Sequence, residues 1–373
     1  MSTIVRVALA HHHDRSYDIL IEPGLFRQIP EMLVSRFPRH SCAIISDSNV
    51  AALYGQDLLE RIRAVSGNPC FLYTFLHGEE RKTRETKSML EDAMFHNQHD
   101  RKTLVIALGG GVTGDLAGYL AATYMRGVPF VQIPTSLLAQ VDSSVGGKTG
   151  VDVPAGKNLV GAFWQPSGVY IDPNLLSTLP EREYLSGLGE IVKHALMFSP
   201  EMIHLLEHGQ HPIMERDPLM MADLVAKNCT IKAGVVSADE TESGLRRTLN
   251  FGHTVAHAIE LASGYSVSHG VAVMAGILVE VRAAVLSGLL SEESATAMGT
   301  TVMRYLHNPP GIQNFDPDTM VQAMLLDKKN TEGAIHCSLP EAPGIPPDCT
   351  WTRAFSEEIL KAALRDVFLP TGG

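Results

Sequence analysis

The sequence predicts an α/β fold in its first half and a mainly α-helical second half. In the first half, short apolar runs alternate with segments whose apolar residues recur at helical spacing. From about residue 181 onward only the helical spacing persists. With 373 residues, the chain is longer than one hydrophobic core usually serves. We therefore expect two domains, an α/β domain at 1–180 and a helical domain at 181–373.

The apolar runs of the first half are expected to form a parallel sheet flanked by helices. Alternation of strands and helices along the chain is typical of such a sheet, which binds ligands at the carboxyl ends of its strands. The expected strands cover residues 3–9, 16–21, 42–47, 70–76, 103–108 and 130–133. The expected helices between them cover residues 26–36, 87–97 and 116–124.

A glycine-rich turn, residues 109–115, separates the strand at 103–108 from the helix at 116–124. Its Gly-Gly-Gly-Val-Thr-Gly-Asp run contains the GxGxxG pattern, in which backbone amides and a helix N-terminus can bind a pyrophosphate. Many other tight strand-to-helix turns also use glycines. The usual ribose-binding acid about 20 residues downstream is missing, and Asp47, at the end of an earlier strand, is the candidate for that role. The first domain is thus expected to be a variant Rossmann-like nucleotide-binding domain.

Two polar segments with lysines follow, at 142–150 and 156–158. Long polar stretches inside a compact chain tend to be binding loops. The end of the first segment resembles a Walker A loop, but Asp142 stands where the first glycine of that motif belongs. Binding of a nucleoside triphosphate is therefore not expected.

The second half carries apolar residues at helical spacing throughout. We expect helices at 181–197, 219–236, 250–261, 271–288, 291–306 and 316–326, and a final helix after Trp351. A helical domain packed on a nucleotide-binding domain leaves a cleft in which active sites usually lie.

Three polar side chains recur on one face of the helix expected at 250–261. His253, His257 and Glu260 stand at positions i, i+4 and i+7 and project together. His269 begins the next helical segment, and Glu190 lies inside the first one. Two histidines and a carboxylate from three separate helices fit a catalytic divalent-metal site. The competing interpretation is that each histidine is a hydrogen-bonded core residue.

Charge and cysteine content limit the partners and the compartment. A formal net charge of -11 argues against nucleic acid or an anionic membrane as a partner, although a small anionic ligand needs only a local basic pocket. Five cysteines without a CxxC pair indicate a reducing compartment, and we expect a cytoplasmic protein. We expect no signal peptide and no membrane span. Histidines 11–13 are interpreted as a solvated loop.

The run from Gly109 to Pro180 resembles the 3-dehydroquinate synthase family, and the ordered match extends over about residues 40 to 335. Within this run the resemblance rests on GGGVTGDLAG at 109–118, ATYMRG at 122–127, QVDSSVGGKT at 140–149 and GKNLVGAF at 156–163. Further along, it rests on GLGEIVK at 187–193, LRRTLNFGHT at 245–254, HG at 269–270 and DKK at 327–329.

The resemblance implies a dehydroquinate synthase-like fold and a lyase that depends on NAD and a divalent metal, zinc or cobalt. Such an enzyme converts 3-deoxy-D-arabino-heptulosonate 7-phosphate into 3-dehydroquinate and phosphate, within the shikimate pathway to chorismate and the aromatic amino acids. NAD is recycled in each turnover, and positioning of the substrate should supply much of the rate. The resemblance also suggests a homodimer.

Site residues carry over position by position. The matching metal ligands are Glu190, His253 and His269, and His257 matches a catalytic histidine that relays protons. The family's substrate-contacting positions fall on Arg126, Asp142, Lys148, Asn158, Lys193, Lys232, Arg246, Asn250, Lys328 and Lys329. Its NAD-binding positions fall on Asp47, Asn49, Gly78, Glu79, Glu80, Arg81, Lys82, Gly111, Val112, Thr113, Gly114, Asp115, Thr135, Ser136, Lys148, Lys157, Leu175, Leu176, Ser177 and Thr178. The basic members would neutralise a carboxylate and a phosphate; a surface salt bridge is the alternative for any one of them.

Three positions depart from the family pattern. Val271 replaces the glutamate of the usual His-Gly-Glu-Ala-Val motif, a corner where relatives acting on other sugar phosphates vary. His77 and Gly189 are departures of minor importance, the second standing where alanine is common. A related sugar phosphate cyclase and a metal-dependent polyol dehydrogenase therefore stay open as alternatives. A protein that only binds a metal and a nucleotide is disfavoured because it would have no use for His257.

Overall fold

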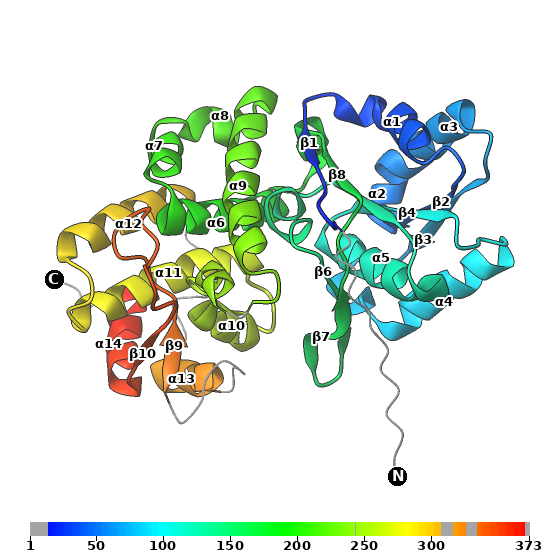
Figure 1. Ribbon diagram of the computed structural model, residues 1–373. Coiled ribbons are helices and arrows are strands. Elements are labelled where there is room, and N and C mark those ends of the chain that lie inside the picture. Colours follow the sequence, from blue (N-terminus) through cyan, green and yellow to red (C-terminus); the bar gives the residue numbers. More distant parts are fainter. Residues whose placement is uncertain (1–13, 243, 307–315, 326–333, 370–373) are drawn as a thin grey trace, which may run out of the picture.

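The computed structural model describes residues 14–242, 244–306, 316–325 and 334–369. Its N-terminal part carries a sheet with helices and its C-terminal part is mainly helical, and Figure 1 shows the two parts side by side. The predicted fold class is confirmed. The strand expected at 3–9 and histidines 11–13 lie outside the described residues.

The sheet of the N-terminal part has six strands in the order β1-β8-β5-β4-β2-β3, and each neighbouring pair is parallel. All carboxyl ends therefore lie at one edge of the sheet. The strands are β1 (Ile19–Ile21), β2 (Ser41–Asp47), β3 (Cys70–Phe75), β4 (Thr103–Gly109), β5 (Phe130–Pro134) and β8 (Gly168–Ile171).

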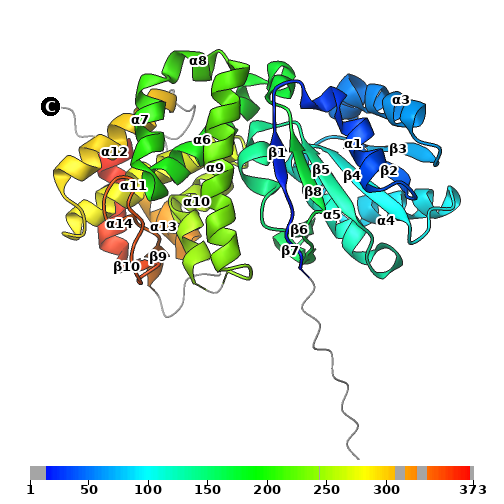
Figure 2. The ribbon, with the colours of Figure 1, turned by 45° about the horizontal axis from the view of Figure 1, so that its top comes forward.

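Helices cover both faces of this sheet, as expected for parallel strands buried on both sides. In β2, Ile44 packs in the cluster with α1 (Ile29–Arg36) and α3 (Gln56–Val65). Its neighbour Ile45 packs on the opposite face, with α4 (Arg84–His96) and α5 (Gly111–Thr123). Figure 2 shows the sheet between these helices. The short elements of this part are η1 (Leu25–Arg27), α2 (Ser48–Val50), η2 (Ala51–Gly55), η3 (Glu79–Arg81), η4 (Tyr124–Arg126), η5 (Ala139–Ser143) and η6 (Pro173–Thr178).

The sequence prediction did not include β8 or α3, and two further local features differ from it. The helix expected at 116–124 begins five residues earlier, because the glycine turn itself forms the first helical turn of α5, with Gly110 as N-cap. Of the polar segments expected as binding loops, residues 148–150 and 156–158 lie in an antiparallel hairpin, β6 (Lys148–Val153) and β7 (Gly156–Phe163), whereas residues 142 and 143 belong to η5. The hairpin strands are rich in glycine and lysine, so the pattern lacked the apolar alternation by which strands are recognised.

The C-terminal part packs around α11 (His269–Leu286), which contacts α6, α10, α12 and α14. The helices are α6 (Glu181–Phe198), α7 (Pro200–His208), α8 (Gln210–Met214), α9 (Pro218–Ala238), α10 (His253–Ala262), α12 (Glu292–Tyr305), α13 (Pro317–Leu325) and α14 (Glu357–Phe368). They are joined by η7 (Leu245–Asn250) and by a two-stranded pair, β9 (Ile335–Cys337) and β10 (Arg353–Phe355).

Helix α11 is long and apolar enough to cross a bilayer by length and composition alone. In the structure most of its side chains are buried against neighbouring helices, and Glu280 in its middle accepts a hydrogen bond from the Gly252 amide. Burial in the helical core accounts for its apolar composition.

Candidate active site

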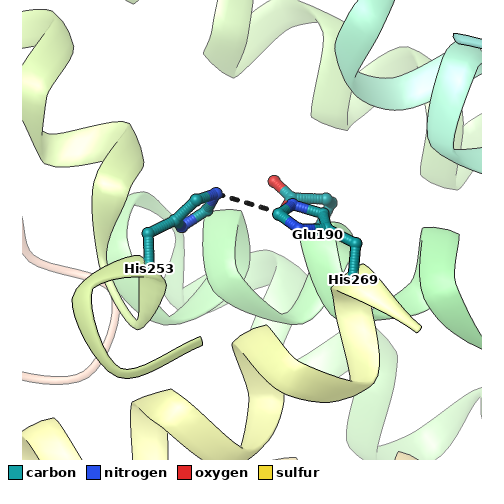
Figure 3. Close-up of side chains that lie close together, drawn as sticks. All are labelled: Glu190, His253 and His269. Atoms are coloured by element: carbon teal, nitrogen blue, oxygen red, sulfur yellow. Dashed lines mark ion pairs between the residues drawn. The ribbon is translucent and has the colours of Figure 1, made fainter. Parts of the chain in front are cut away.

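Glu190, His253 and His269 meet at one point between three helices. The carboxylate comes from the middle of α6, while the two histidines are the first residues of α10 and α11. Oε1 of Glu190 lies 3.6 Å from Nε2 of His253 and 3.3 Å from Nε2 of His269. The three candidate ligand atoms all lie within 4.8 Å of one another. Figure 3 shows the side chains pointing toward a common centre.

Glycines allow the helices that carry these three side chains to approach one another closely. A Cβ atom on Gly189 would lie 2.2 Å from the carbonyl oxygen of Gly270, so α6 and α11 touch backbone to backbone beside the two ligands. Gly252, the N-cap of α10, has a φ of 79°, a left-handed conformation that favours glycine. The departure at Gly189, treated above as minor, therefore lies at a contact that positions Glu190 next to His269.

The electrostatics of the cluster fit a divalent cation. Glu190 is 1% exposed, and its Oε1 has no hydrogen-bond donor among the described residues. Burial alone would raise its pKa, but Lys193, His269 and His253 outweigh this effect and hold the pKa well below its usual range. Burial and Lys193 lower the pKa of His253, which leaves a neutral imidazole with a free lone pair. An ionised carboxylate oxygen without a donor, faced by two imidazoles, is a donor set suited to zinc or cobalt.

Glu260 contacts His269 on the side of the ring that faces away from the cluster. Its Oε1 lies 3.4 Å from Nδ1 of His269, on the far side of the ring from Glu190. Burial lowers the pKa of His269, but the two carboxylates raise it to about 10, so this position favours positive charge. A carboxylate behind a ligating histidine orients the ring and increases its basicity. The helical spacing correctly placed Glu260 on the face of His253 but did not reveal this contact with His269.

A second group of possible ligands, Asp142, Glu190 and His194, is less suited to a metal. The Lys232 ammonium group already binds the Asp142 carboxylate, with Nζ 2.6 Å from Oδ1, whereas the bond of Lys193 to Glu190 is common to both groups. We therefore assign the candidate metal centre to the first group.

A cluster of buried cations adjoins the metal centre, as expected of a local basic pocket in an acidic chain. Lys193, Lys232 and Arg246 are 2%, 5% and 2% exposed. Lys232 donates to the backbone carbonyl of Asp142 as well as to its carboxylate. Arg246 donates to the carbonyl oxygens of Glu240 and Gly146. Lys232 and Arg246 thus contact the N-terminal part of the chain, whereas Lys193 pairs with Glu190 on its own helix.

Glu242 is a residue of this region that the sequence analysis missed. Its carboxylate forms an ion pair with Lys148 from β6 and accepts a hydrogen bond from Nδ2 of Asn250 at 3.1 Å. It therefore joins two of the predicted substrate-contacting residues. The available signal was the acidic run Asp239, Glu240 and Glu242 directly before the LRRTLNFGHT motif.

Among the described residues, Arg126 is a predicted catalytic position that is not brought to this cluster. Arg126 is exposed and follows α5, whose 13 residues span roughly 20 Å away from the carboxyl edge of the sheet. Lys328 and Lys329 lie outside the described residues. Asn158 is exposed on β7, with a φ of 55° and its amide bonded to Asp152. The ring centroid of His257 is 5.7 Å from that of His253.

Most of the predicted NAD-binding residues follow the carboxyl ends of the sheet's strands, whereas Lys148 and Lys157 lie on the β6–β7 hairpin. Asp47 ends β2, residues 78–82 follow β3, residues 111–115 follow β4, Thr135 and Ser136 follow β5, and residues 175–178 follow β8. The Asp47 carboxylate caps α2 through the amides of Asn49 and Val50, and it also accepts a 3.3 Å hydrogen bond from Thr113.

The glycine turn packs closely against two serine side chains. A Cβ on Gly110 would lie 3.2 Å from Oγ of Ser136, and one on Gly111 would lie 3.2 Å from Oγ of Ser143. Such a turn leaves backbone amides accessible to a pyrophosphate. Ser143 closes η5, which also contains Asp142, so this segment connects the turn with the cation cluster.

Lys82 anchors the outer side of the predicted nucleotide site. Its ammonium group is buried and lies 2.8 Å from Glu79, 3.4 Å from Asp115 and 3.7 Å from Asp152. Burial raises the pKa of Asp115 to about 7, although Lys82 opposes the shift. These contacts tie the segment after β3, the start of α5 and the β6–β7 hairpin together.

The fold joins a parallel sheet of the nucleotide-binding type to helices that carry a carboxylate and two histidines around one point. This combination defines a class of metal-dependent α/β enzymes. Family models described as 3-dehydroquinate synthase N-terminal and C-terminal match residues 72–186 and 187–330. The chain belongs to the 3-dehydroquinate synthase family.

Relatives and solved structures agree with this assignment. The chain is 42% identical to the 3-dehydroquinate synthase of Nitrosomonas europaea, with 95% of each chain covered. It is 41% identical to that of Pseudomonas entomophila, with 94% of each covered. The structure resembles 2-epi-5-epi-valiolone synthase from Streptomyces hygroscopicus with bound NAD+ and Zn2+, at 30% identity and a TM-score of 0.85, covering 97% of this chain and 99% of the other. A glycerol dehydrogenase from Schizosaccharomyces pombe, at 16% identity and a TM-score of 0.64, shares the fold alone, with 96% and 91% covered.

Proposed function

We propose that the protein is an enzyme that converts 3-deoxy-D-arabino-heptulosonate 7-phosphate into 3-dehydroquinate and phosphate. The observation that carries this proposal is the Glu190, His253 and His269 centre directly beside buried lysines. A substrate with a carboxylate and a phosphate needs both features, since the cation takes hydroxyl oxygens and the ammonium groups take the anionic ends. The family membership supports the same reaction.

Two cofactors complete the site in this proposal. Glu190, His253 and His269 would hold zinc or cobalt, and the glycine turn with Asp47 would hold NAD. When bound, NAD would accept and return a hydride and the metal would polarise a substrate hydroxyl. Support comes from 2-deoxy-scyllo-inosose synthase, a structure at 27% identity and a TM-score of 0.83 that was solved with carbaglucose-6-phosphate, NAD+ and Co2+.

The chain's own residues bind and orient the substrate. Lys193, Lys232 and Arg246 neutralise anionic groups in a water-poor cluster, where charge interactions are stronger than in bulk water. Asp142 holds Lys232 in one position through its carboxylate and its carbonyl. His257, one helical turn from the candidate ligand His253, is the proton-transferring residue in this proposal. Positioning of this kind supplies much of the rate in reactions within one molecule.

Two alternatives predict different products. A related sugar phosphate cyclase would use the same metal and cofactor sites, and Val271 in the first turn of α11 is the sequence change that favours it. A polyol dehydrogenase would share the fold but would have no need for three buried cations beside the metal.

An assay of phosphate release tests the proposal. With the heptulosonate phosphate, a divalent metal and catalytic NAD, we expect one phosphate per substrate and no accumulation of NADH. Stoichiometric NADH would instead establish the dehydrogenase. Inertness toward this substrate with turnover of sedoheptulose 7-phosphate would establish the related cyclase.

Three further proposals concern organisation. We propose a domain boundary near residue 180, because the sheet-bearing part ends before α6 begins at Glu181. A cytoplasmic location is supported by five free cysteines, four of which are buried. The homodimer suggested by the family resemblance remains a prediction.

A further inference from the structure

The β6–β7 hairpin contacts the metal-bearing helices through a lysine and a tyrosine. Nζ of Lys157, near the start of β7, lies 4.2 Å from the centroid of the Tyr265 ring. Tyr265 belongs to the connection between α10 and α11, whose first residues are His253 and His269. In Figure 1 the hairpin projects from the sheet-bearing part on the side of α10. The contact therefore joins the two parts of the chain next to the candidate metal centre.

Tyr265 has an unfavourable backbone conformation and an exposed side chain. Its φ is 63°, and the preceding Gly264 has a φ of 58°, so two successive residues are left-handed. Bulky residues rarely adopt this region. The residue is also 51% exposed. Neither the backbone nor burial explains a tyrosine here, whereas its aromatic face over an ammonium group does.

The surrounding structure holds the strained backbone in place. The Tyr265 amide donates to the carbonyl oxygen of Glu260 at 2.8 Å, and Arg182 from α6 donates to the carbonyl oxygen of Ser266 at 3.0 Å. Strained conformations persist where neighbours over-determine them, and they concentrate at functional sites.

Glu260 connects this loop with the metal centre. Its backbone carbonyl holds the Tyr265 amide, and its side chain contacts Nδ1 of His269. A shift of the loop would therefore change the position of His269, a candidate metal ligand. On the other side of the contact, the hairpin carries three predicted ligand-binding residues, Lys148, Lys157 and Asn158.

We propose that Tyr265 is a positioning residue that holds Lys157 through a cation–π contact and thereby fixes the β6–β7 hairpin against the metal-bearing helices. The inference rests on the proposed function, in which the hairpin binds NAD and substrate. Without the aromatic face the hairpin samples open positions, so ligands bind more weakly while the bound complex still reacts.

Steady-state kinetics of three variants test the role of the ring. Tyr265→Leu should raise KM for NAD and substrate about fivefold, the change expected for a half-exposed cation–π contact, with kcat within about twofold of wild type. Tyr265→Phe keeps the aromatic face and should behave as wild type. Tyr265→Gly should reproduce the KM of Tyr265→Leu without any loss of thermal stability, because glycine relieves the left-handed backbone. A wild-type KM in Tyr265→Leu, or equal losses in the leucine and phenylalanine variants, would overturn the inference.

A double-mutant cycle tests the pairing with Lys157. In a Lys157→Met background, Tyr265→Leu should change KM no further, because the two residues act through one contact. Additive effects of the two substitutions would show that Tyr265 does not act through Lys157.

Hydrogen exchange separates this inference from the proposed reaction, since it requires no turnover. In the full chain, the amides of residues 156–163 should exchange faster in Tyr265→Leu than in wild type or Tyr265→Phe. Unchanged exchange would refute the hairpin contact even in an active enzyme. Loosened exchange in a protein that is inert toward the heptulosonate phosphate would retain the contact and reject the reaction.

Discussion

The Glu260 carboxylate lies 3.4 Å from Nδ1 of His269, opposite the nitrogen that faces Glu190. We expect Glu260→Gln to weaken zinc binding by about 10- to 100-fold, as observed when partners behind ligating histidines are lost. Competition with a chelating dye measures the affinity. Glu293→Gln, at an exposed position of α12, serves as the matched control and should bind zinc normally.

Glu190 is predicted to matter for stability as well as for metal binding. Its Oε2 pairs with the ammonium of Lys193, and both side chains are almost fully buried. Glu190→Gln leaves that ammonium group without its counter-charge, which should lower the free energy of unfolding by about 3–5 kcal/mol. Urea unfolding of the metal-free protein measures the loss. A loss no greater than that of the exposed control Glu201→Gln would contradict the buried pair.

Two lysines of α9 provide a paired test of the cation cluster. Lys232 is buried against Asp142, whereas Lys227 is partly exposed and pairs with surface carboxylates. Lys232→Met should lower kcat/KM by about 100-fold, since a desolvated charge contact to an anion is worth 2–3 kcal/mol. Lys227→Met should leave kcat/KM unchanged. Equal activity in both variants would place the substrate elsewhere.

The hydrogen bonds of Asp172 are expected to contribute to the free energy of unfolding, at a position outside the candidate metal centre. Asp172 is 2% exposed and accepts hydrogen bonds from the amides of Gly24, Phe26 and Asn174, each at 2.9 Å. Asp172→Asn replaces one acceptor oxygen by a donor and removes the charge, so we expect a loss of about 2–3 kcal/mol of unfolding free energy. Chemical denaturation measures this loss. Asp57→Asn, on the exposed face of α3, should change the midpoint far less.

The burial of His99 is expected to make the free energy of unfolding depend on pH. His99 is 3% exposed, and its Nε2 has no hydrogen-bond partner among the described residues. Burial lowers its pKa, so the folded state disfavours the protonated ring. The stability from neutral His99 is complete above the unfolded pKa of about 6.5 and is lost as pH falls below it, by at most about 1.4 kcal/mol per pH unit.

Comparison with His99→Asn isolates this contribution. Below pH 6.5 the unfolding free energy of wild type should fall more steeply than that of the variant. The exposed control His96→Asn should retain the wild-type slope. Parallel curves for wild type and His99→Asn would contradict the prediction.

The spacing of apolar residues along the sequence predicted much of the fold. The apolar runs predicted β2, β4 and β5 within about a residue, because parallel strands buried on both faces are continuously apolar. The helical spacing predicted α6 within about a residue, whereas the predicted bounds of α10 and α11 differ from the observed ones by up to three residues. The β6–β7 hairpin escaped prediction because its glycines and lysines interrupt the alternation of apolar residues by which strands are recognised.

The residue types of the metal centre, and the shared helical face of His253 and His257, follow from the sequence alone, since local spacing determines which side chains project together. Only the tertiary structure decided that Glu190 meets His269, that Glu242 reaches Lys148, and that Tyr265 faces Lys157. These contacts join segments far apart in the chain. Their distances depend on backbone approaches such as Gly189 against Gly270, which no local pattern encodes.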